Sequence, residues 1–267
     1  MNLAICSLAS GSSGNCYVIR GGDTFVLVDA GISGKQIRER LDAIGLAPSR
    51  LSAVLVTHSH SDHIKGLGAV IKTTDADIHA NKATALDFSK DIPGDRLQLF
   101  ATGERFAIGE LEVCSFPVSH DTSDPVGFSF RRGGSQVSIV TDTGVVTPAV
   151  MDQIRSADIL VLESNHDENI LRMGRYPWFL KQRILSEVGH LSNEAAAKAL
   201  AQALEEEAAE GLSRTRTVLL AHLSQENNFP EMALTTVNNI LEERGVLRSG
   251  LKIRVLPRTE QSPVYTV

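Results

Sequence analysis

The chain has 267 residues, of which 42 % are hydrophobic and 22 % charged, a composition that excludes disordered, collagen-like and coiled-coil proteins. Lys and Arg number 26 and Asp and Glu number 32, which gives a formal net charge of -6. The protein is therefore not broadly basic, and an anionic partner has to be bound at a local site. The length fits one large domain or two small ones, and we expect a single domain over residues 1–267.

The three cysteines, Cys6, Cys16 and Cys114, are too few and too scattered for a disulfide framework. One Cys6–Cys16 bridge is conceivable, but reduced thiols in a cytoplasmic protein are the favoured interpretation. A Ser-Gly run at residues 10–14 interrupts the first apolar stretch, so we expect no secretory leader. No apolar run approaches the roughly 18 residues that span a bilayer, and we expect no membrane partner.

The predicted elements alternate in type along the chain. The first third predicts strands at residues 3–8, 16–19, 24–28 and 51–56, and a helix that Ser33 caps and Gly45 ends. Five further strands are predicted at residues 96–100, 105–108, 111–116, 127–130 and 136–140. Strands at 159–162, 217–220 and 252–256 then alternate with helices at 192–210 and 230–244. This pattern predicts an α/β fold with two mixed sheets packed face to face and helices outside.

The strongest motif is Thr57-His58-Ser59-His60-Ser61-Asp62-His63, directly after a predicted buried strand. Three of the chain's 8 histidines and one aspartate fall within six residues. Imidazole and carboxylate groups suit zinc, manganese or iron, and one tight loop lets these side chains converge on two adjacent ions. A polar loop with coincidental histidines is the much weaker alternative.

With this H-x-H-x-D-H motif the chain resembles the metallo-β-lactamase superfamily, a four-layer αββα sandwich, and the resemblance covers nearly the whole sequence. Asp29 in Leu-Val-Asp-Ala-Gly matches the early aspartate that supports the histidine loop. His120, Asp142 and His222 match later motifs, each at the end of a predicted strand. The resemblance implies one metal held by His58, His60 and His120, a second by Asp62, His63 and His222, and Asp142 shared. Taken singly, each of the three later residues is as well explained as an ordinary polar side chain.

Two divalent ions in this arrangement, zinc or manganese or iron, can bind a bridging hydroxide and stabilise the attacking and leaving oxygens of an in-line displacement. The resemblance implies that Asp62 helps to hold the hydroxide. The fold serves phosphodiesters, thioesters and lactams alike, so it does not define the substrate.

Glu163 and His190 narrow the chemistry. In the tRNA 3′-processing branch of the superfamily, a glutamate at such a strand end pairs with a histidine before the next helix, and the histidine protonates the departing oxygen. The sequence around Glu163 and His190 resembles that arrangement. The alternative interpretation places His190 beside the Ser192 N-cap with no catalytic task.

Residues 171–183 carry four cations, no acid and the only tryptophan. Guanidinium groups suit phosphate oxygens, and aromatic rings stack on bases. The candidate substrate-binding residues are Arg172, Arg175, Tyr176, Trp178, Lys181 and Arg183. An amphipathic helix with an aromatic core face is the alternative. The Ser-Gly turn at 10–15 is a plain turn or a place where backbone amides approach a phosphate.

The runs at residues 163–167, 189–193 and 222–228 resemble the YycJ/WalJ-type family, whose members are assigned 5′-to-3′ exonuclease activity on DNA. His120 and Asp142 are 22 positions apart, which leaves no room for the long arm of the tRNA-processing enzymes. The 80 positions from Asp142 to His222 exclude the large inserted domain of RNA-cleaving relatives.

The leading hypothesis is therefore a dinuclear metal-dependent phosphodiesterase acting on nucleic acid, DNA favoured over RNA, as a 5′-to-3′ exonuclease. One alternative is a hydrolase of small phosphodiesters, thioesters or lactones. The other is a metal-stabilised interaction module without catalysis, against which the complete ligand set argues. The oligomeric state, the exo- or endonucleolytic mode and the native metal are left open.

Overall fold

The computed structural model describes residues 3–88, 90, 92–212 and 214–267. Seven strands form the first sheet: β1 (Leu3–Gly11), β2 (Gly14–Gly21), β3 (Thr24–Val28), β4 (Ala53–Leu55), β5 (Asp77–Asn81), β6 (Leu97–Phe100) and β14 (Tyr265–Thr266). The second sheet also has seven: β7 (Arg105–Ile108), β8 (Leu111–Pro117), β9 (Val126–Arg132), β10 (Ser135–Val140), β11 (Ile159–Glu163), β12 (Arg216–Ala221) and β13 (Leu251–Val255).

The helices are α1 (Gly34–Ala43), α2 (Ser61–Ile64), α3 (Leu67–Thr73), α4 (Lys82–Ala85), α5 (Pro148–Ser156), α6 (Glu168–Met173), α7 (Trp178–Ile184), α8 (Asn193–Ala209) and α9 (Pro230–Glu243), with 3-10 turns at Pro48–Arg50 and Gly94–Arg96. Ser33 caps α1 and Ser192 caps α8, as predicted. Each serine hydroxyl accepts a hydrogen bond from a backbone N–H of the first turn.

Both sheets are mixed. The first runs in the order β14-β1-β2-β3-β4-β5-β6, antiparallel up to β3 and parallel from β3 to β6. The second runs β13-β12-β11-β10-β9-β8-β7, parallel from β10 to β13 and antiparallel from β7 to β9. The predicted α/β class with two mixed sheets is confirmed.

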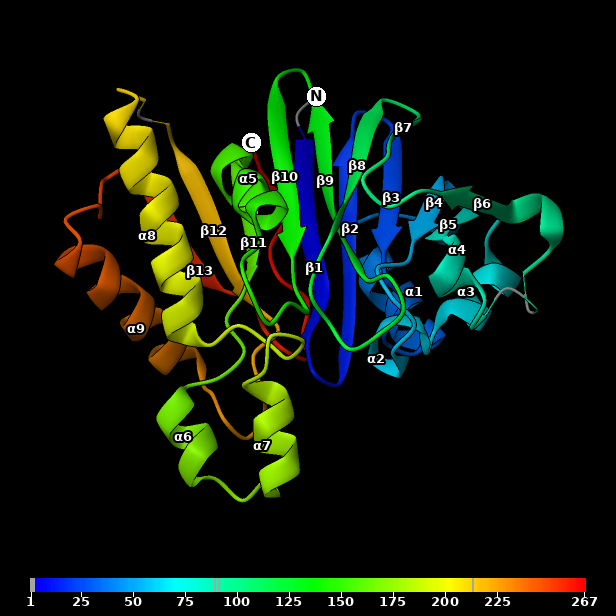
Figure 1. Ribbon diagram of the computed structural model, residues 1–267. Helices are drawn as coiled ribbons and strands as arrows, with labels where there is room; N and C mark the ends of the chain where they lie inside the picture. Colours follow the sequence, from blue (N-terminus) through cyan, green and yellow to red (C-terminus); the bar gives the residue numbers. More distant parts are fainter. Residues whose placement is uncertain (1–2, 89, 91, 213) are drawn as a thin grey trace. The chain divides into compact units, whose positions relative to one another are not determined.

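The chain divides into two compact units, residues 1–117, 122–135 and 257–267 in unit 1 and residues 118–121 and 136–256 in unit 2. The single-domain expectation stays a prediction. In unit 1, α1 and α3 bury leucine, isoleucine and valine side chains against one face of the first sheet. Strands β7 to β9 pack on the other face (Figure 1). There the Phe100 ring contacts the rings of Phe106 and Phe128.

Unit 2 is built on the parallel strands β10 to β13. Residues 159–162 are completely buried, which explains why β11 is an uninterrupted apolar run. Helices α5, α8 and α9 cover this part of the sheet, while α6 and α7 form a small helical pair that extends from the carboxyl ends of the strands (Figure 1). We name this pair, residues 168–184, the α6–α7 lobe.

Cys6, Cys16 and Cys114 are all free thiols, so the conceivable Cys6–Cys16 bridge is absent. In the part of the chain that the structure describes, no helix is both long enough and apolar enough to cross a membrane.

Candidate metal centre

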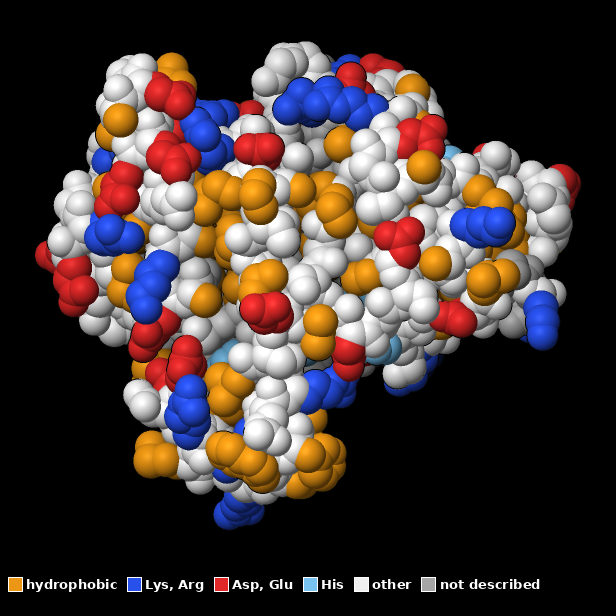
Figure 2. Space-filling view, viewed as in Figure 1, with side chains coloured by type: hydrophobic (Ala, Val, Ile, Leu, Met, Phe, Trp, Pro, Cys, Tyr) orange, Lys and Arg blue, Asp and Glu red, His pale blue; other side chains and the backbone are white. Residues whose placement is uncertain are grey.

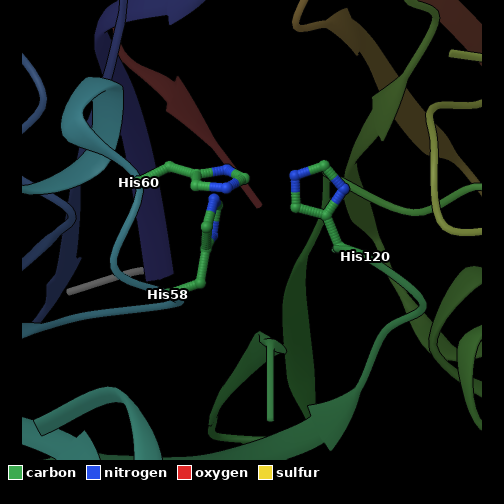
Figure 3. Close-up of side chains that lie close together, drawn as sticks. All are labelled: His58, His60 and His120. Carbon is green, nitrogen blue, oxygen red and sulfur yellow. The ribbon is translucent and has the colours of Figure 1, made fainter. Parts of the chain in front are cut away.

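The histidine loop follows β4 in unit 1. His60 has extended backbone angles and stands at the N-cap of α2, so Asp62 and His63 lie in the first turn of that helix. The His58 ring lies 4.8 Å from the His60 ring and 4.0 Å from the His63 ring, measured between centroids. Figure 3 shows His58 and His60 projecting side by side from this loop. The turn into α2 therefore gathers the donor side chains of one short segment.

Asp29, at the end of β3, supports this loop. Its Oδ2 accepts a 2.7 Å hydrogen bond from His63 Nδ1, and its Oδ1 accepts one of 2.9 Å from the Thr57 backbone N–H. The Thr57 hydroxyl donates to Asp29 and lies 3.0 Å from His58 Nδ1. These bonds direct the Nε2 atoms of both imidazoles away from Asp29, as ligand histidines require. Burial raises the pKa of Asp29, and the contacts with His63 and Thr57 oppose that rise.

Unit 2 carries the other donors at strand ends. His120 follows β8, Asp142 follows β10 and His222 follows β12, and all three are buried. His120 donates from Nδ1 to the Gly189 carbonyl at 3.2 Å, and its Nε2 lies 3.9 Å from Asp142 Oδ1. Figure 3 shows the His120 ring on the segment after β8.

Backbone strain marks the same strand ends. Asp29, Asp142 and His222 have φ angles of 58°, 58° and 57°, and Asp124 is the only other described non-glycine residue with positive φ. A left-handed conformation costs roughly 1–3 kcal/mol for such residues and persists only where the surroundings impose it. Three of the four strained residues are thus predicted site residues.

Glu163 organises the centre of unit 2. Its buried carboxylate accepts 2.8 Å hydrogen bonds at Oε1 from Nδ1 of both His190 and His222. Burial alone would raise the pKa of Glu163, but the two imidazoles hold it well below its usual range. The pairing with His190 is the predicted one, whereas the contact with His222 was not foreseen. Together Asp142, Glu163, His190 and His222 form a cluster whose donor atoms could hold a metal ion.

Two asparagines outside the predicted site residues hold His222 in place. Asn165 donates to the His222 carbonyl at 2.8 Å, and Asn228 donates to the Asn165 carbonyl at 3.1 Å. Both amides are buried. Their proximity in sequence to Glu163 and His222 was a signal, but an asparagine without a ligand motif gives no indication of its task.

The remaining two histidines match no ligand motif. His79 stacks on Phe106 with ring centroids 5.5 Å apart, which agrees with a structural role. His166 is 1 % exposed, and neither ring nitrogen has a hydrogen-bond partner in the described residues. Burial lowers the pKa of His166 to about 4, so this ring is neutral at ordinary pH.

The neutral His166 predicts acid sensitivity. Between about pH 6.5 and 4 the unfolded chain binds a proton at this position and the folded chain does not. Stability should therefore fall by ~1.4 kcal/mol per pH unit in this window, roughly 3 kcal/mol in all, and no further below it. Urea unfolding at several pH values, with chelator present, measures the slope. His166→Gln should reduce the slope of stability against pH by ~1.4 kcal/mol per pH unit, the contribution of one proton. An unchanged slope would contradict the assignment.

The α6–α7 lobe exposes most of the candidate substrate-binding residues. Met173, Trp178 and Phe179 are 81 %, 64 % and 72 % exposed, an unusual concentration of apolar surface. Figure 2 shows hydrophobic side chains gathered over α6 and α7, with cations beside them. The aromatic side chains therefore do not form a buried core face, which was the alternative interpretation.

Lys181 differs from the other cations of the lobe. It is buried, and its Nζ donates 2.7 Å hydrogen bonds to the carbonyls of Arg172 and Gly174. Its charge thus fixes the end of α6 against α7. Arg183 donates to Asp121 at 2.5 Å, and Arg172 pairs with Glu168 at 3.2 Å, whereas Arg175 is exposed. The exposed cations are the ones that substrate could reach.

The donor set fits divalent transition metals. Unit 1 offers the imidazoles of His58, His60 and His63 with the carboxylate of Asp62, and unit 2 offers the imidazoles of His120 and His222 with the carboxylate of Asp142. This combination of nitrogen and oxygen ligands with outer hydrogen-bond partners suits divalent metal ions.

The model of the metallo-beta-lactamase superfamily matches residues 9–204. The chain belongs to that superfamily, and it is a hydrolase of the superfamily with metal-binding His and Asp clusters. The structure of the metallo-beta-lactamase fold protein YhfI from Bacillus subtilis has the same fold, with a TM-score of 0.75, 16 % identity and complete coverage of both chains.

Curated relatives are nucleases by name. The chain is 42 % identical over 248 residues to "Exodeoxyribonuclease YycJ" of Bacillus anthracis, and this alignment covers 92 % of this chain and 91 % of the relative. It is 40 % identical over 241 residues to "Exodeoxyribonuclease WalJ" of Streptococcus pneumoniae, covering 88 % and 87 %. A shorter stretch of 62 residues is 42 % identical to "Ribonuclease Z" of Mycobacterium marinum, covering 23 % of this chain and 21 % of the relative. The resemblance to the YycJ/WalJ-type family and to the tRNA-processing branch is confirmed.

Proposed function

We propose that the protein is a dinuclear metal-dependent exonuclease that degrades DNA from the 5′ end. The 2.8 Å contact between Glu163 and His190, beside Asp142, is the observation that supports the proposal, because a histidine held by a carboxylate in this position could carry a proton to the leaving group. The exodeoxyribonuclease relatives, aligned over nine-tenths of the chain, support DNA as substrate. A DNA substrate and three free thiols fit a cytoplasmic location.

The metal ligands in this proposal are seven residues of the family motifs. Family membership and motif order assign one ion to His58, His60 and His120, the other to Asp62, His63 and His222, with Asp142 between them. Two such ions, zinc or manganese or iron, would supply an activated water and neutralise the phosphate oxygens.

The protein side chains divide the remaining work. Asp62, in the first turn of α2, accepts a hydrogen bond from the attacking water and so orients it. Glu163 holds Nδ1 of His190 and so directs the opposite nitrogen, Nε2, outward. When the ring is protonated, Nε2 donates its proton to the 3′ oxygen that leaves, which is poor at leaving as an alkoxide.

The α6–α7 lobe binds the DNA strand in this proposal. Arg172, Arg175 and Arg183 contact phosphates, while Trp178 and Tyr176 stack on bases. Lys181 acts indirectly, because its ammonium group holds the lobe together. An exposed tryptophan beside exposed arginines is the arrangement that single-strand binding needs.

Replacing either Trp178 or Arg175 by alanine should weaken DNA binding and leave the rate of phosphodiester hydrolysis unchanged. Loss of one stacked base costs ~1–3 kcal/mol, so KM for single-stranded DNA should rise about fivefold or more in Trp178→Ala. Turnover of a small diester should not change. In Arg175→Ala the salt dependence of DNA affinity should become less steep, by about one unit of slope per lost phosphate contact. Gln182→Ala, an exposed change on α7, is the matched control, and a KM equal to wild type in both variants would remove the lobe from the proposal.

A substrate panel separates the proposal from its alternatives. Protein reconstituted with zinc or with manganese is given DNA, RNA, bis-p-nitrophenyl phosphate, a thioester and a lactone at equal concentration. We expect DNA to be cleaved at least 100-fold more efficiently than the small substrates. Preference for a small ester would instead support the small-molecule hydrolase, and inactivity on all five with both metals bound would support the non-catalytic module.

A further inference from the structure

The Ser-Gly turn between β1 and β2 leads to Asn15, whose side chain lies against the histidine loop. Asn15 Nδ2 is 3.0 Å from His63 Nε2 and 3.4 Å from Asp62 Oδ2, and the asparagine is completely buried. These two atoms are the ones that the proposed second metal ion would use. The three side chains all belong to unit 1.

Glycines make this approach feasible. The Gly31 backbone N–H donates to the Asn15 carbonyl at 2.8 Å. A Cβ on Gly31 would lie 1.6 Å from the Asp62 backbone carbonyl oxygen and 2.6 Å from the Asn15 backbone nitrogen, so no larger residue fits. A Cβ on Gly14 would lie 2.7 Å from the Gly31 carbonyl oxygen. The turn, the segment after Asp29 and α2 are therefore packed backbone to backbone, which fixes Asn15 beside Asp62 and His63.

The distances are those between ligands of one ion. With metal–nitrogen and metal–oxygen bonds of about 2.0–2.2 Å, neighbouring ligand atoms lie roughly 3.0–3.5 Å apart. The Asn15 amide end, at 3.0 and 3.4 Å from the other two donors, satisfies this spacing. His63 Nε2 and Asp62 Oδ2 are themselves 3.6 Å apart.

The amide has to present its oxygen to a cation. Asp29 accepts from Nδ1 of His63, so His63 Nε2 is the nitrogen available to a metal, and an N–H aimed at it would be repelled by the ion. Half a turn about the Cβ–Cγ bond exchanges the two ends of an amide, which have nearly equal size. Asn15 Oδ1 has no hydrogen-bond partner in the described part of the chain, so this rotation breaks no bond at that end.

We propose that Asn15 is an additional ligand, through its amide oxygen, of the metal ion that Asp62 and His63 bind. The proposal rests on the proposed dinuclear site and deepens it. It assigns to the Ser-Gly turn the task of supplying a ligand, in place of an amide cradle for phosphate.

Metal binding tests this without reference to turnover. Zn²⁺ content and affinity are measured by equilibrium dialysis, and the Co²⁺-substituted protein gives a visible absorption spectrum that reports on the ligands. We expect Asn15→Ala to lose about tenfold or more in affinity for one of two ions and to change the cobalt spectrum. Asn15→Asp, which keeps an oxygen donor at this position, should bind at least as tightly as wild type. Ser13→Ala, an exposed change in the same turn, should match wild type throughout.

The aspartate variant separates a ligand from a simple hydrogen-bond donor. If Asn15 only donates to Asp62, then a second carboxylate repels Asp62, and Asn15→Asp binds metal as poorly as Asn15→Ala or worse. That result would overturn the proposal, as would wild-type affinity and spectrum in Asn15→Ala. Should Asn15→Ala fail to fold, the aspartate result decides alone. Wild-type protein that binds no metal would refute the proposed function itself, whereas two bound ions and DNA cleavage with unaffected Asn15 variants would refute only this inference.

Discussion

Replacing His60 by alanine is expected to abolish metal binding and nuclease activity together. His60 stands at the N-cap of α2 and is partly exposed, so its loss removes a donor without opening the core. Loss of an outer hydrogen-bond partner of a metal site already costs ~10–100-fold in affinity, and loss of a direct ligand should cost more. We expect at least one ion to be lost from the purified protein and turnover to fall at least 1,000-fold.

Metal content by plasma mass spectrometry and nuclease turnover are the two measurements for His60→Ala. Ser61→Ala, an exposed neighbour in the same turn, is the control and should retain both. The fold should survive in both variants, which thermal unfolding monitored by circular dichroism can establish. Full metal occupancy and normal turnover in His60→Ala would remove His60 from the ligand set.

Replacing His190 by alanine should have a different signature, with metal content preserved and turnover reduced. General acid catalysis contributes ~10²–10⁴-fold, so a loss of that size is expected on DNA. With a p-nitrophenyl ester of thymidine 5′-phosphate the loss should nearly vanish, because p-nitrophenolate leaves without a proton. An equal loss on both substrates would contradict the proton-donor role.

Glu163→Gln provides the comparison for His190→Ala. Because Glu163 accepts from both His190 and His222, its replacement should reduce both turnover and metal affinity. His190→Ala should reduce turnover alone. Identical metal affinities in the two variants would show that the contact between Glu163 and His222 is not important for the site.

Most strands were predictable because their residues form short apolar runs that the fold buries. Every strand predicted from the sequence is present, and the residues at 159–162 show why, since four adjacent apolar side chains are all buried in β11. β5 was missed because its sequence, Asp-Ile-His-Ala-Asn, has polar residues at both ends and a histidine at its centre. Helices α3 and α5 were missed because each is at most nine residues long and makes too few turns for a helical period to appear. Helices α6 and α7 lie where an amphipathic helix was the alternative interpretation.

The candidate site was predictable only where a motif exists. The spacing of His58, His60, Asp62 and His63 on one loop is visible in the sequence, and His120, Asp142 and His222 follow from the family pattern. The second contact of Glu163, the amides of Asn165 and Asn228, and the position of Asn15 depend on residues distant in sequence. Such contacts become visible only when the fold brings the segments together.

Lys181 shows that a position in a basic segment does not by itself predict contact with substrate. Its sequence context, among other cations and aromatic residues, suggested contact with substrate. The structure instead uses its ammonium group inside the lobe, at two backbone carbonyls. A cation in a basic segment is available to a ligand only when nearby backbone carbonyls do not already accept its hydrogen bonds.

The most direct test of the account is the pattern of products from end-labelled DNA. Protein that has been stripped by chelator and reconstituted with Mn²⁺ or Zn²⁺ is incubated with single-stranded DNA that carries a label at either the 5′ or the 3′ end, with and without a 5′ phosphate. We expect the 5′ label to appear at once in mononucleotides, the 3′ label to remain on progressively shorter strands, and no cleavage before metal is restored. Cleavage without metal, or no release from DNA in the presence of two bound ions, would contradict it.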